Sequence, residues 1–579
     1  MKRHNRDDYY VIGEGILTLD SNGEPITVRP SAIAEVRKFR FSRLGPVGAP
    51  IDDTQRLIVE TVATAMTTDP AGGDPESGVK DHGSPDSGIP SGFTYLGQFV
   101  DHDLTRDNNT DRLGQDVTVD ELVQGRSPSL DLDSLYGRGP QKDPRFYADD
   151  GVSLKSGSTT GVGKGAPGAD NPFARLSHDG FDLPRVGTGS TLADQRLANI
   201  PDRRNDENLA VAQTHLAFIR FHNRVVRTLA GSTPSVQLFS AARNTVVRHY
   251  QWMLRTDFLP RVVDPAIVTD VFTNGRRFFE VPAAYGDLGW YPRYGGKNIQ
   301  PGDLPTMPIE FSVAAYRLGH SMIRGAYEWN AVFNRKQGIP ATLLLLFAFS
   351  GTSGILAPPP SGSVSDLNDP NIGGLKLPSN WVADFRRLYD FSEAKRDDLT
   401  IAPDDFNITK RIDTLLVNPL QQLPLGTFGG QDATVHAAGR QLNLAFRNLT
   451  RAGMVRLGSG QQLAKYLEVP PLTTDQIIAG NQGASLDQLA ADQKDSFAKN
   501  TPLWFYILRE AELNGGRLTG VGGRIVAEVF HRAMEGSNAS IVRDPSWRPS
   551  LGPDNHTFRM VDLLLFAFEG KKELLAPLG

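Results

Sequence analysis

The segment TYLGQFVDHDLTRD at residues 94–107 is the starting point for predicting the fold, because it combines an apolar helical pattern with a histidine between two carboxylates. If the segment is helical, Gln98, Asp101 and His102 fall at positions i, i+3 and i+4 and share a face, whereas Asp103 points elsewhere. Such a histidine is a candidate general base, a candidate metal ligand or a structurally paired imidazole. The segment alone leaves these three interpretations open.

The composition of the 579-residue chain is that of an ordinary globular protein, with 39% hydrophobic and 22% charged residues. Its formal net charge of −5 indicates neither a nucleic-acid partner nor a polybasic membrane anchor, so we expect small-molecule partners. The chain contains no cysteine, which excludes disulfides, iron–sulfur clusters and thiolate-ligated metals. Any metal must therefore be held by histidine, carboxylate or carbonyl groups.

Most of the chain shows apolar residues at three- and four-residue spacing, which is typical of helices. The longest predicted helices cover residues 208–230, 308–323, 436–457 and 502–515. Stretches rich in Gly, Pro, Ser and Asp predict surface loops over residues 69–92, 155–172 and 357–379. Strand-like alternation is scarce, so we expect a mainly α fold with little β structure. The expected organisation is an N-terminal arm over residues 1–40 and one large domain over residues 41–579.

Two apolar runs, at residues 342–350 and 561–568, are too short to span a bilayer and are expected to form buried helix or strand. The N-terminal residues include no apolar stretch like that of a secretory signal peptide. We therefore expect no integral membrane segment. The sequence leaves the compartment open between the cytoplasm and export by a route other than Sec, and it predicts no oligomeric state.

Three further segments gather residues suited to metal binding or catalysis, and each also has a plain structural interpretation. SPSLDLDSLYG at 127–137 offers oxygen ligands at alternate positions, or is an acidic surface turn. IPDRRNDENL at 200–209 precedes an amphipathic helix, where its acidic residues would also cap the helix. AAYRLGHSMIR at 314–324 contains a lone helical histidine, which in most proteins is a satisfied core residue.

In their order and wide separation, these segments resemble the motifs of the animal-type haem peroxidases, which belong to the peroxidase–cyclooxygenase superfamily. GQFVDHDLT resembles the distal-helix motif of that family, and the resemblance extends from about residue 90 to the C-terminus. It implies a disulfide-free, bacterial-type member similar to myeloperoxidase and lactoperoxidase, with a helical peroxidase domain and one haem b. The first 40 or so residues are not explained by it.

On the distal side of the haem, the resemblance assigns three residues to catalysis. His102 is expected to take a proton from peroxide and return it to the leaving oxygen. Arg204, in the family pattern D-x-R-x-x-E that starts at Asp202, is expected to stabilise the developing charge. Gln98 is expected to position the peroxide or a halide.

The same resemblance implies a covalently held haem. Asp101 and Glu207 match the two residues that form ester bonds to haem methyl groups in the family. Myeloperoxidase has a methionine directly after the glutamate, which forms a sulfonium link, whereas this chain has Asn208. We therefore expect ester bonds but no sulfonium bond, as in lactoperoxidase.

On the proximal side, His320 matches the axial iron ligand, and Arg317 is expected near the haem edge. The family holds the other nitrogen of this histidine with an asparagine in an N-x-x-R pattern. RNLTR at 447–451 matches that pattern, so Asn448 is expected beside His320 and Arg451 beside a haem propionate. The sequence after this motif, AGMVRLGSG, departs from that of the mammalian enzymes.

A calcium ion is the second implied cofactor, and the resemblance places it next to the distal helix. The matching ligands are side chains and one carbonyl, and they come from Asp103, Ser127, Ser129 (carbonyl), Asp131 and Asp133. Asp133 stands where the mammalian enzymes have a hydroxyl residue, which adds negative charge. The ion is expected to fix the distal helix rather than to take part in the reaction.

The remaining histidines have no comparable motif around them and are expected to serve packing and local hydrogen bonds. They are His4, His82, His178, His215, His222, His249, His436, His531 and His556.

The resemblance implies an enzyme that reduces hydrogen peroxide and oxidises small organic donors, with halides or thiocyanate as a further donor class. One alternative is a haem-dependent fatty-acid dioxygenase of the cyclooxygenase type, which has a radical-forming tyrosine three residues before the proximal histidine. Arg317 occupies that position here, and Tyr316 lies one residue further back, which favours a peroxidase. Another alternative is a non-catalytic binding protein with calcium-ordered loops, which gives no reason for His102, Arg204 and His320 to occur together.

Overall fold

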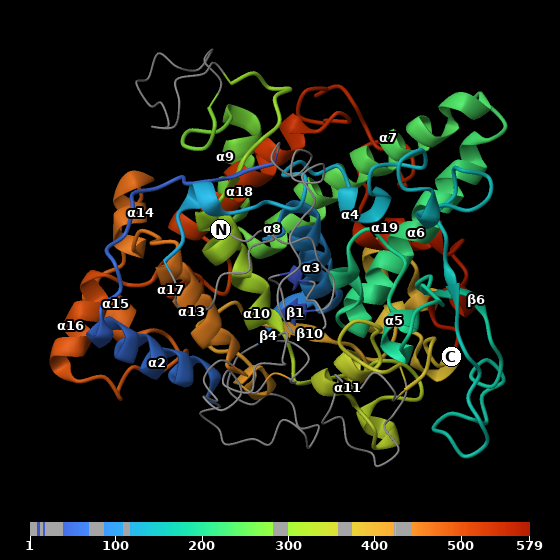
Figure 1. Cartoon of the computed structure of the whole chain (residues 1–579), viewed down its shortest axis with the longest axis horizontal. Coiled ribbons are helices and arrows are strands. Elements are labelled where there is room, and N and C mark those ends of the chain that lie inside the picture. The colour runs from blue at the N-terminus through green and yellow to red at the C-terminus, as the bar shows by residue number, and fades with distance from the viewer. Residues whose placement is uncertain are drawn as a thin grey trace.

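The computed structural model describes residues 9–11, 15–17, 39–68, 86–107, 116–281, 299–356, 373–421, 423 and 442–579. Over these residues the fold is mainly α-helical, as the sequence predicts (Figure 1). The α-helices are α2 (Asp53–Thr67), α3 (Gly92–Leu104), α4 (Asp133–Tyr136), α5 (Leu192–Arg196), α6 (Leu209–Leu229), α7 (Ser235–Met253), α8 (Leu259–Val262), α9 (Pro265–Asn274), α10 (Gly319–Met322), α11 (Leu343–Ala348), α13 (Leu444–Met454), α14 (Gly460–Tyr466), α15 (Thr474–Ala479), α16 (Ala491–Lys499), α17 (Leu503–Leu513), α18 (Gly520–Gly536), α19 (Met560–Ala567) and α20 (Lys572–Leu575).

The β structure of the described residues consists of short strands that form two-stranded sheets. The strands are β1 (Tyr9–Val11), β2 (Gly15–Leu17), β3 (Phe41–Ser42), β4 (Asp86–Pro90), β5 (Gly157–Ser158), β6 (Asp179–Asp182), β7 (Met307–Pro308), β8 (Ala326–Tyr327), β9 (Ala341–Thr342) and β10 (Ile408–Lys410). β3 pairs with β7 in parallel, and the pairs β1–β2, β4–β10, β5–β6 and β8–β9 are antiparallel.

Three of the four longest predicted helices are regular where the structure describes them. They correspond to α6, α13 and α17, and residues 436–441 of the third prediction lie outside the described residues. The fourth, over 308–323, is not one helix. It consists of a π-helical turn (Glu310–Ala314), a 3₁₀ turn (Ala315–Leu318) and α10. Such interruptions occur often at functional sites.

The predicted loops agree only in part with the structure. In the first predicted loop, over residues 69–92, residues 86–92 instead form β4 and the start of α3. Residues 69–85 lie outside the described residues. The second predicted loop, over residues 155–172, contains only the short strand β5. In the third, residues 357–372 also lie outside the described residues. The two apolar runs form α11 and α19. None of the described helices is long and apolar enough to cross a membrane.

Helix α3 lies near the middle of the molecule in Figure 1, with α6 on one side and α13 and α17 on the other. Its apolar residues Phe93, Leu96, Phe99 and Val100 are buried. The polar residues 101–103 at its C-terminal end are buried with them. The helix starts at Gly92, where a Cβ would come within 2.3 Å of the Tyr389 ring. Only glycine therefore allows this close packing.

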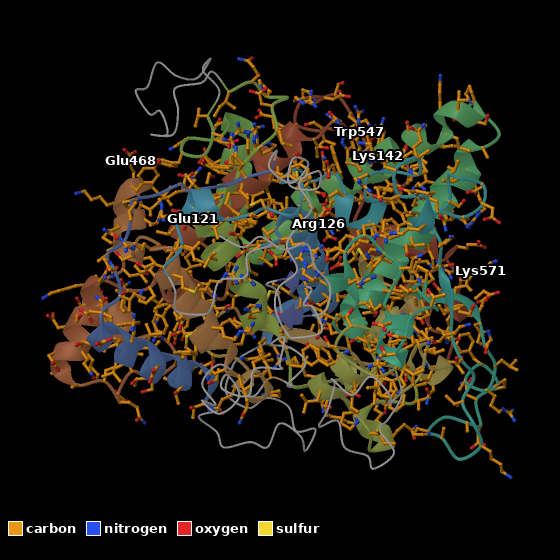
Figure 2. All side chains as sticks on the ribbon, in the orientation of Figure 1. Glu121, Arg126, Lys142, Glu468, Trp547 and Lys571 are labelled. Carbon is orange, nitrogen blue, oxygen red and sulfur yellow. The ribbon has the colours of Figure 1, made fainter. Side chains whose placement is uncertain are left out.

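A single contiguous cluster of buried apolar side chains runs from Phe41 to Leu578. Figure 2 shows these interior side chains filling the space between the ribbons, with the exposed Glu468 and Lys571 at opposite edges of the view. Burial of this apolar area is the main favourable contribution to folding. The boundary between arm and domain at residue 40 stays a prediction.

Candidate active site

His102 lies near the C-terminal end of α3 and is fully buried. Its Nδ1 donates to Asn205 Oδ1 at 2.9 Å. Its Nε2 lies 3.7 Å from a carboxylate oxygen of Glu207 and has no hydrogen-bond partner among the described residues. Burial, together with the charge of Arg204, lowers the pKa of His102 well below its usual range. The ring is therefore neutral near pH 7, with a lone pair at Nε2.

Arg204 is held in one orientation by buried acceptors. Its Nε and Nη2 donate to Asp202 at 3.0 and 2.8 Å, and Nη2 also donates to the carbonyls of His102 and Thr105. Although burial opposes ionisation, the charges of Arg126 and Arg204 hold the pKa of Asp202 well below its usual range. Nη1 of Arg204 is buried without a partner among the described residues. Figure 2 shows Arg126 beside α3 near the middle of the view.

Gln98, Glu207 and Asn208 form a second polar cluster beside His102. Gln98 Nε2 donates to Glu207, and Asn208 Nδ2 donates to Gln98 Oε1 at 2.9 Å. The Asn208 side chain also caps α6 by accepting from the N–H of Val211. The residue that replaces the sulfonium-forming methionine thus orients the Gln98 amide.

Asp101 lies one residue before His102 on α3, and its carboxylate accepts from Thr105 Oγ1 at 3.0 Å. Burial raises the pKa of Asp101, while the charges of Arg317 and Arg204 oppose that rise. The side chain lines a cavity, so the carboxyl group is available to a molecule bound there.

His320 stands on α10, where the interrupted helix turns it toward the same cavity. The side-chain Nδ2 of Asn448 on α13 lies 2.9 Å from His320 Nδ1. The N-x-x-R pattern led us to expect these two side chains side by side. Arg317 Nε donates to the carbonyl of Ser312 at 2.8 Å within the π- and 3₁₀-helical turns. The indole of Trp504 lies edge-on to His320, with 6.4 Å between ring centroids.

These residues line one cavity, whose space not filled by atoms is about 710 Å³ when the open solvent at its mouth is included. Gln98 and Asp101 of α3 line it together with Arg317 and His320. The remaining lining is mainly apolar, and it includes Phe93, Phe258, Tyr316, Ile323, Leu343 and Phe347.

A smaller cavity of about 360 Å³ shares Arg317 with the first. Arg204 and Arg451 also line it, and Arg451 forms an ion pair with Asp107. Three guanidinium groups at one cavity form a site for carboxylate groups.

The predicted calcium ligands also come together. Carboxylate oxygens of Asp103, Asp131 and Asp133 all lie within 4.8 Å of one another. Ser127 Oγ donates to Asp131, and the Ser129 carbonyl accepts from the N–H of Asp131. Burial, followed by the charge of Asp133, raises the pKa of Asp131 to about 7.

Sequence reasoning missed some contacts of these residues. Ser134 donates to Asp103 through its N–H and its hydroxyl, and Tyr250 OH reaches the same carboxylate at 3.5 Å. Asn205 joins His102 to His215, a histidine expected to serve only packing and local hydrogen bonds. The position of Asn205 beside Arg204 was the available signal, since it lies inside the matched pattern.

Comparisons with known proteins concern the family and the fold of the chain. The family model described as animal haem peroxidase matches residues 103–351. A peroxidase-like protein of Margaritifera margaritifera is 31% identical over 157 residues, which are 26% of this chain and 17% of that protein. Chorion peroxidase of Drosophila melanogaster is 30% identical over 210 residues, 35% of this chain and 24% of that protein. The chain thus spans only about a fifth of the length of these relatives.

Among solved structures, peroxidase A from Dictyostelium discoideum superposes with a TM-score of 0.52 at 16% identity, covering 99% of this chain and 98% of that one. A fatty acid alpha-dioxygenase of Arabidopsis thaliana gives a TM-score of 0.50 at 12% identity, with 99% and 84% covered. At such identities the likeness concerns the fold. Residues 103–351 therefore match the animal haem peroxidase family, and the chain as a whole shares its fold with these two solved structures.

Proposed function

We propose that this protein is a haem peroxidase that reduces hydrogen peroxide and oxidises small organic donors, with halides or thiocyanate as a further donor class. The observation that carries the proposal is one cavity that is lined both by His320 and by Gln98 and Asp101 of α3. The described residues fit a haem. His320 offers an imidazole, His102 Nε2 and Arg204 Nη1 are buried without hydrogen-bond partners, and the arginines of the smaller cavity suit two propionates.

When bound, haem supplies an iron centre that peroxide oxidises by two electrons. His320 would hold the iron through Nε2, with the proton of its ring on Nδ1. Turning the Asn448 amide puts Oδ1 where Nδ2 now lies, so that it accepts this proton. Arg317 would lie at the haem edge and Arg451 beside a propionate.

On the distal side, His102 takes a proton from peroxide at Nε2 and returns it to the leaving oxygen. Arg204, fixed by Asp202, offers Nη1 to the negative charge that develops on that oxygen. Gln98 is held by Asn208 and positions the peroxide. Because His102 is neutral near pH 7, it is ready to accept the proton.

Asp101 and Glu207 are proposed to form ester bonds to haem methyl groups: each ester would replace one methyl C–H bond by a bond to a carboxylate oxygen, and the proton and two electrons released would go to hydrogen peroxide, which is reduced to water. Both carboxyl groups are buried beside His102 or the cavity, and Asp101 lines the cavity directly. No sulfonium bond is expected, because Asn208 follows Glu207 and its amide is engaged with Gln98.

Calcium is the proposed second cofactor, held by Asp103, Asp131, Asp133, the Ser127 side chain and the Ser129 carbonyl. Three carboxylates within 4.8 Å repel one another, and a divalent cation with oxygen ligands relieves that repulsion. The ion would fix α3 next to His102.

The experiment that tests the main proposal is an absorption spectrum of haem-loaded protein before and after one equivalent of peroxide, followed by acid–organic extraction. A high-spin Soret band that shifts at once, with haem retained after extraction, supports the peroxidase and the esters. A shift with extractable haem supports the enzyme without the covalent bonds. Failure to take up haem contradicts the proposal and favours a calcium-ordered binding protein.

Tyr316 is the observation that favours a second candidate, a fatty-acid dioxygenase. Its ring stacks on Phe311 at 4.7 Å, and its hydroxyl is buried at the cavity without a partner among the described residues. Oxygen uptake with a long-chain fatty acid, abolished by Tyr316→Phe, would establish this activity. If Tyr316→Phe leaves peroxide turnover unchanged and the wild-type protein takes up no oxygen with the fatty acid, the dioxygenase is excluded and the peroxidase is the remaining candidate.

A further inference from the structure

Behind His102, two side chains continue a hydrogen-bonded chain that leads away from the cavity. His102 Nδ1 donates to Asn205 Oδ1 at 2.9 Å, and Asn205 Nδ2 donates to His215 Nδ1 at 3.0 Å. None of the three residues is exposed to solvent. His215 stands on α6 and packs edge-on against Phe99 of α3, with 5.7 Å between ring centroids.

The order of partners along this chain determines where each ring carries its proton. An amide oxygen only accepts and an amide nitrogen only donates. With the Asn205 amide in this orientation, His102 has its proton on Nδ1, which leaves Nε2 as an acceptor. His215 must have its lone pair on Nδ1 and its proton on Nε2.

His215 can keep this role as an acceptor at neutral pH. Burial lowers the pKa of His215 to about 3, so the ring stays neutral and its Nδ1 stays an acceptor. His215 Nε2 has no hydrogen-bond partner among the described residues, so the chain ends there.

We propose that Asn205 and His215 are positioning residues that hold the proton of His102 on Nδ1 and so keep Nε2 free to accept a proton from peroxide. The inference rests on the proposed peroxidase function and adds two residues to it. His215 acts only through Asn205, because it orients the amide and touches neither cavity nor substrate.

Loss of the His215 acceptor has a definite consequence. The Asn205 amide can then turn and present Nδ2 to His102 Nδ1. That nitrogen must become the acceptor, and the proton moves to Nε2. In this tautomer His102 cannot take a proton from peroxide, although its position in the fold is unchanged.

The test compares three variants in haem-loaded protein. His215→Leu removes the acceptor, and His215→Asn keeps one near the position of Nδ1. His222→Leu is the matched control, because His222 is a buried histidine on the same helix that bonds to Tyr136 and Val152 instead. The first readout is the equilibrium dissociation constant of cyanide, since hydrogen cyanide gives its proton to the distal base without turnover. The second is the ¹⁵N spectrum of the histidine rings in the diamagnetic ferrous carbon monoxide complex.

We expect His215→Leu to weaken cyanide binding and to slow the reaction with peroxide, each by on the order of tenfold or more. His215→Asn should restore both to within about threefold, and His222→Leu should lower thermal stability without changing either. The wild-type spectrum should show His102 protonated at Nδ1. A His102 protonated at Nε2, or identical cyanide binding in His215→Leu and His222→Leu, would overturn the proposal.

The test distinguishes failure of the positioning role from failure of the proposed peroxidase function. If wild-type protein responds to peroxide but His215→Leu behaves like the control, only the positioning role is lost. If wild-type protein takes up no haem, the peroxidase proposal is lost. The ¹⁵N spectrum of the haem-free chain then decides the tautomer of His102 by itself, whether or not any variant folds.

Discussion

At the scale of single residues, the burial of His102 matters as much as its identity. The same ring on a surface would be partly protonated near pH 7, whereas burial and the Arg204 charge keep it neutral here. Asn205 occupies one ring nitrogen and leaves the other available. One side chain thus becomes a candidate base through its surroundings.

His102→Ala is expected to slow peroxide reduction by about 10²- to 10⁴-fold while haem stays bound through His320, because only the proton acceptor is removed. Stopped-flow absorption at the Soret band measures the rate, and the resting spectrum reports haem. The matched control is His556→Ala, since His556 is exposed. A near-normal rate in His102→Ala would contradict the distal assignment.

The ester bonds are tested by Asp101→Asn and Glu207→Gln, which keep the size of each side chain but remove the reacting carboxylate. After peroxide turnover, each single variant should keep haem through the remaining ester, and the double variant should release it. Acid–organic extraction followed by mass spectrometry of haem peptides measures this. Wild-type protein not exposed to peroxide serves as the control, and full release from wild type after turnover would reject the esters.

At the scale of elements, helix ends and interruptions bring polar groups to the site. α3 contributes its last turn, α6 its N-terminal cap, and residues 310–322 a mixed π-, 3₁₀- and α-helical segment. Irregular helix frees backbone carbonyls, and Arg317 binds one of them at Ser312. A regular helix would use that carbonyl internally.

Calcium should stabilise residues 127–133, which precede and begin α4. At a free concentration a hundred times its dissociation constant, an ion bound only by the folded state adds about 2.7 kcal/mol to the free energy of unfolding. Thermal unfolding with calcium or with a chelator measures the difference, which should be lost in Asp131→Asn. Asp120→Asn, at an exposed position, should keep the full response. An equal response in both variants would exclude this site.

Glu510 of α17 ties that helix to the start of α18, where it accepts from the N–H groups of Val521 and Gly522. Burial raises the pKa of Glu510 to about 7, from an ordinary value near 4.5 in the unfolded chain. Between these two pH values the folded state therefore holds a proton that the unfolded state releases. The contribution of Glu510 to the free energy of unfolding is complete below about pH 4.5 and is lost as the pH rises through 7.

Glu510→Gln should remove this pH dependence. Between pH 4.5 and 8, the free energy of unfolding of wild type relative to the variant should fall by on the order of 3 kcal/mol. Urea titrations at several pH values measure it. A difference between wild type and variant that does not change with pH would show that Glu510 titrates normally.

At the scale of the whole molecule, segments from both ends of the described chain complete one core. Arg43 donates to the carbonyls of Arg456 and Val455, which follow α13. The buried Glu310 accepts from the N–H groups of Leu44 and Gly45. The residues after the predicted arm therefore pack directly against the segment that leads to His320.

This predicts different outcomes for two truncations. A chain starting at residue 39 should keep the stability that Arg43 and Glu310 supply, because it retains both contacts, although it loses those of β2 with residues 203–206. A chain starting at residue 53 should lose at least about 3 kcal/mol, because Glu310 stays buried without these donors. Thermal unfolding and the Soret band measure both. Equal stability of the two chains would place the domain boundary beyond residue 52.

The sequence by itself determined the helical class, the positions of α3, α6 and α17, and the motifs around His102, Arg204 and His320. The helical class and these helices follow from local apolar periodicity, which acts within one or two turns, whereas the motifs were identified by their resemblance to those of a known family. The resemblance also led us to expect Asn448 beside His320, which it meets across 128 residues. Only the tertiary structure decided the partners that no motif implied, such as the connection of His102 to His215 through Asn205. It also decided the break in the helix predicted over 308–323, because hydrogen bonds and packing between distant segments outweigh local helix preference there.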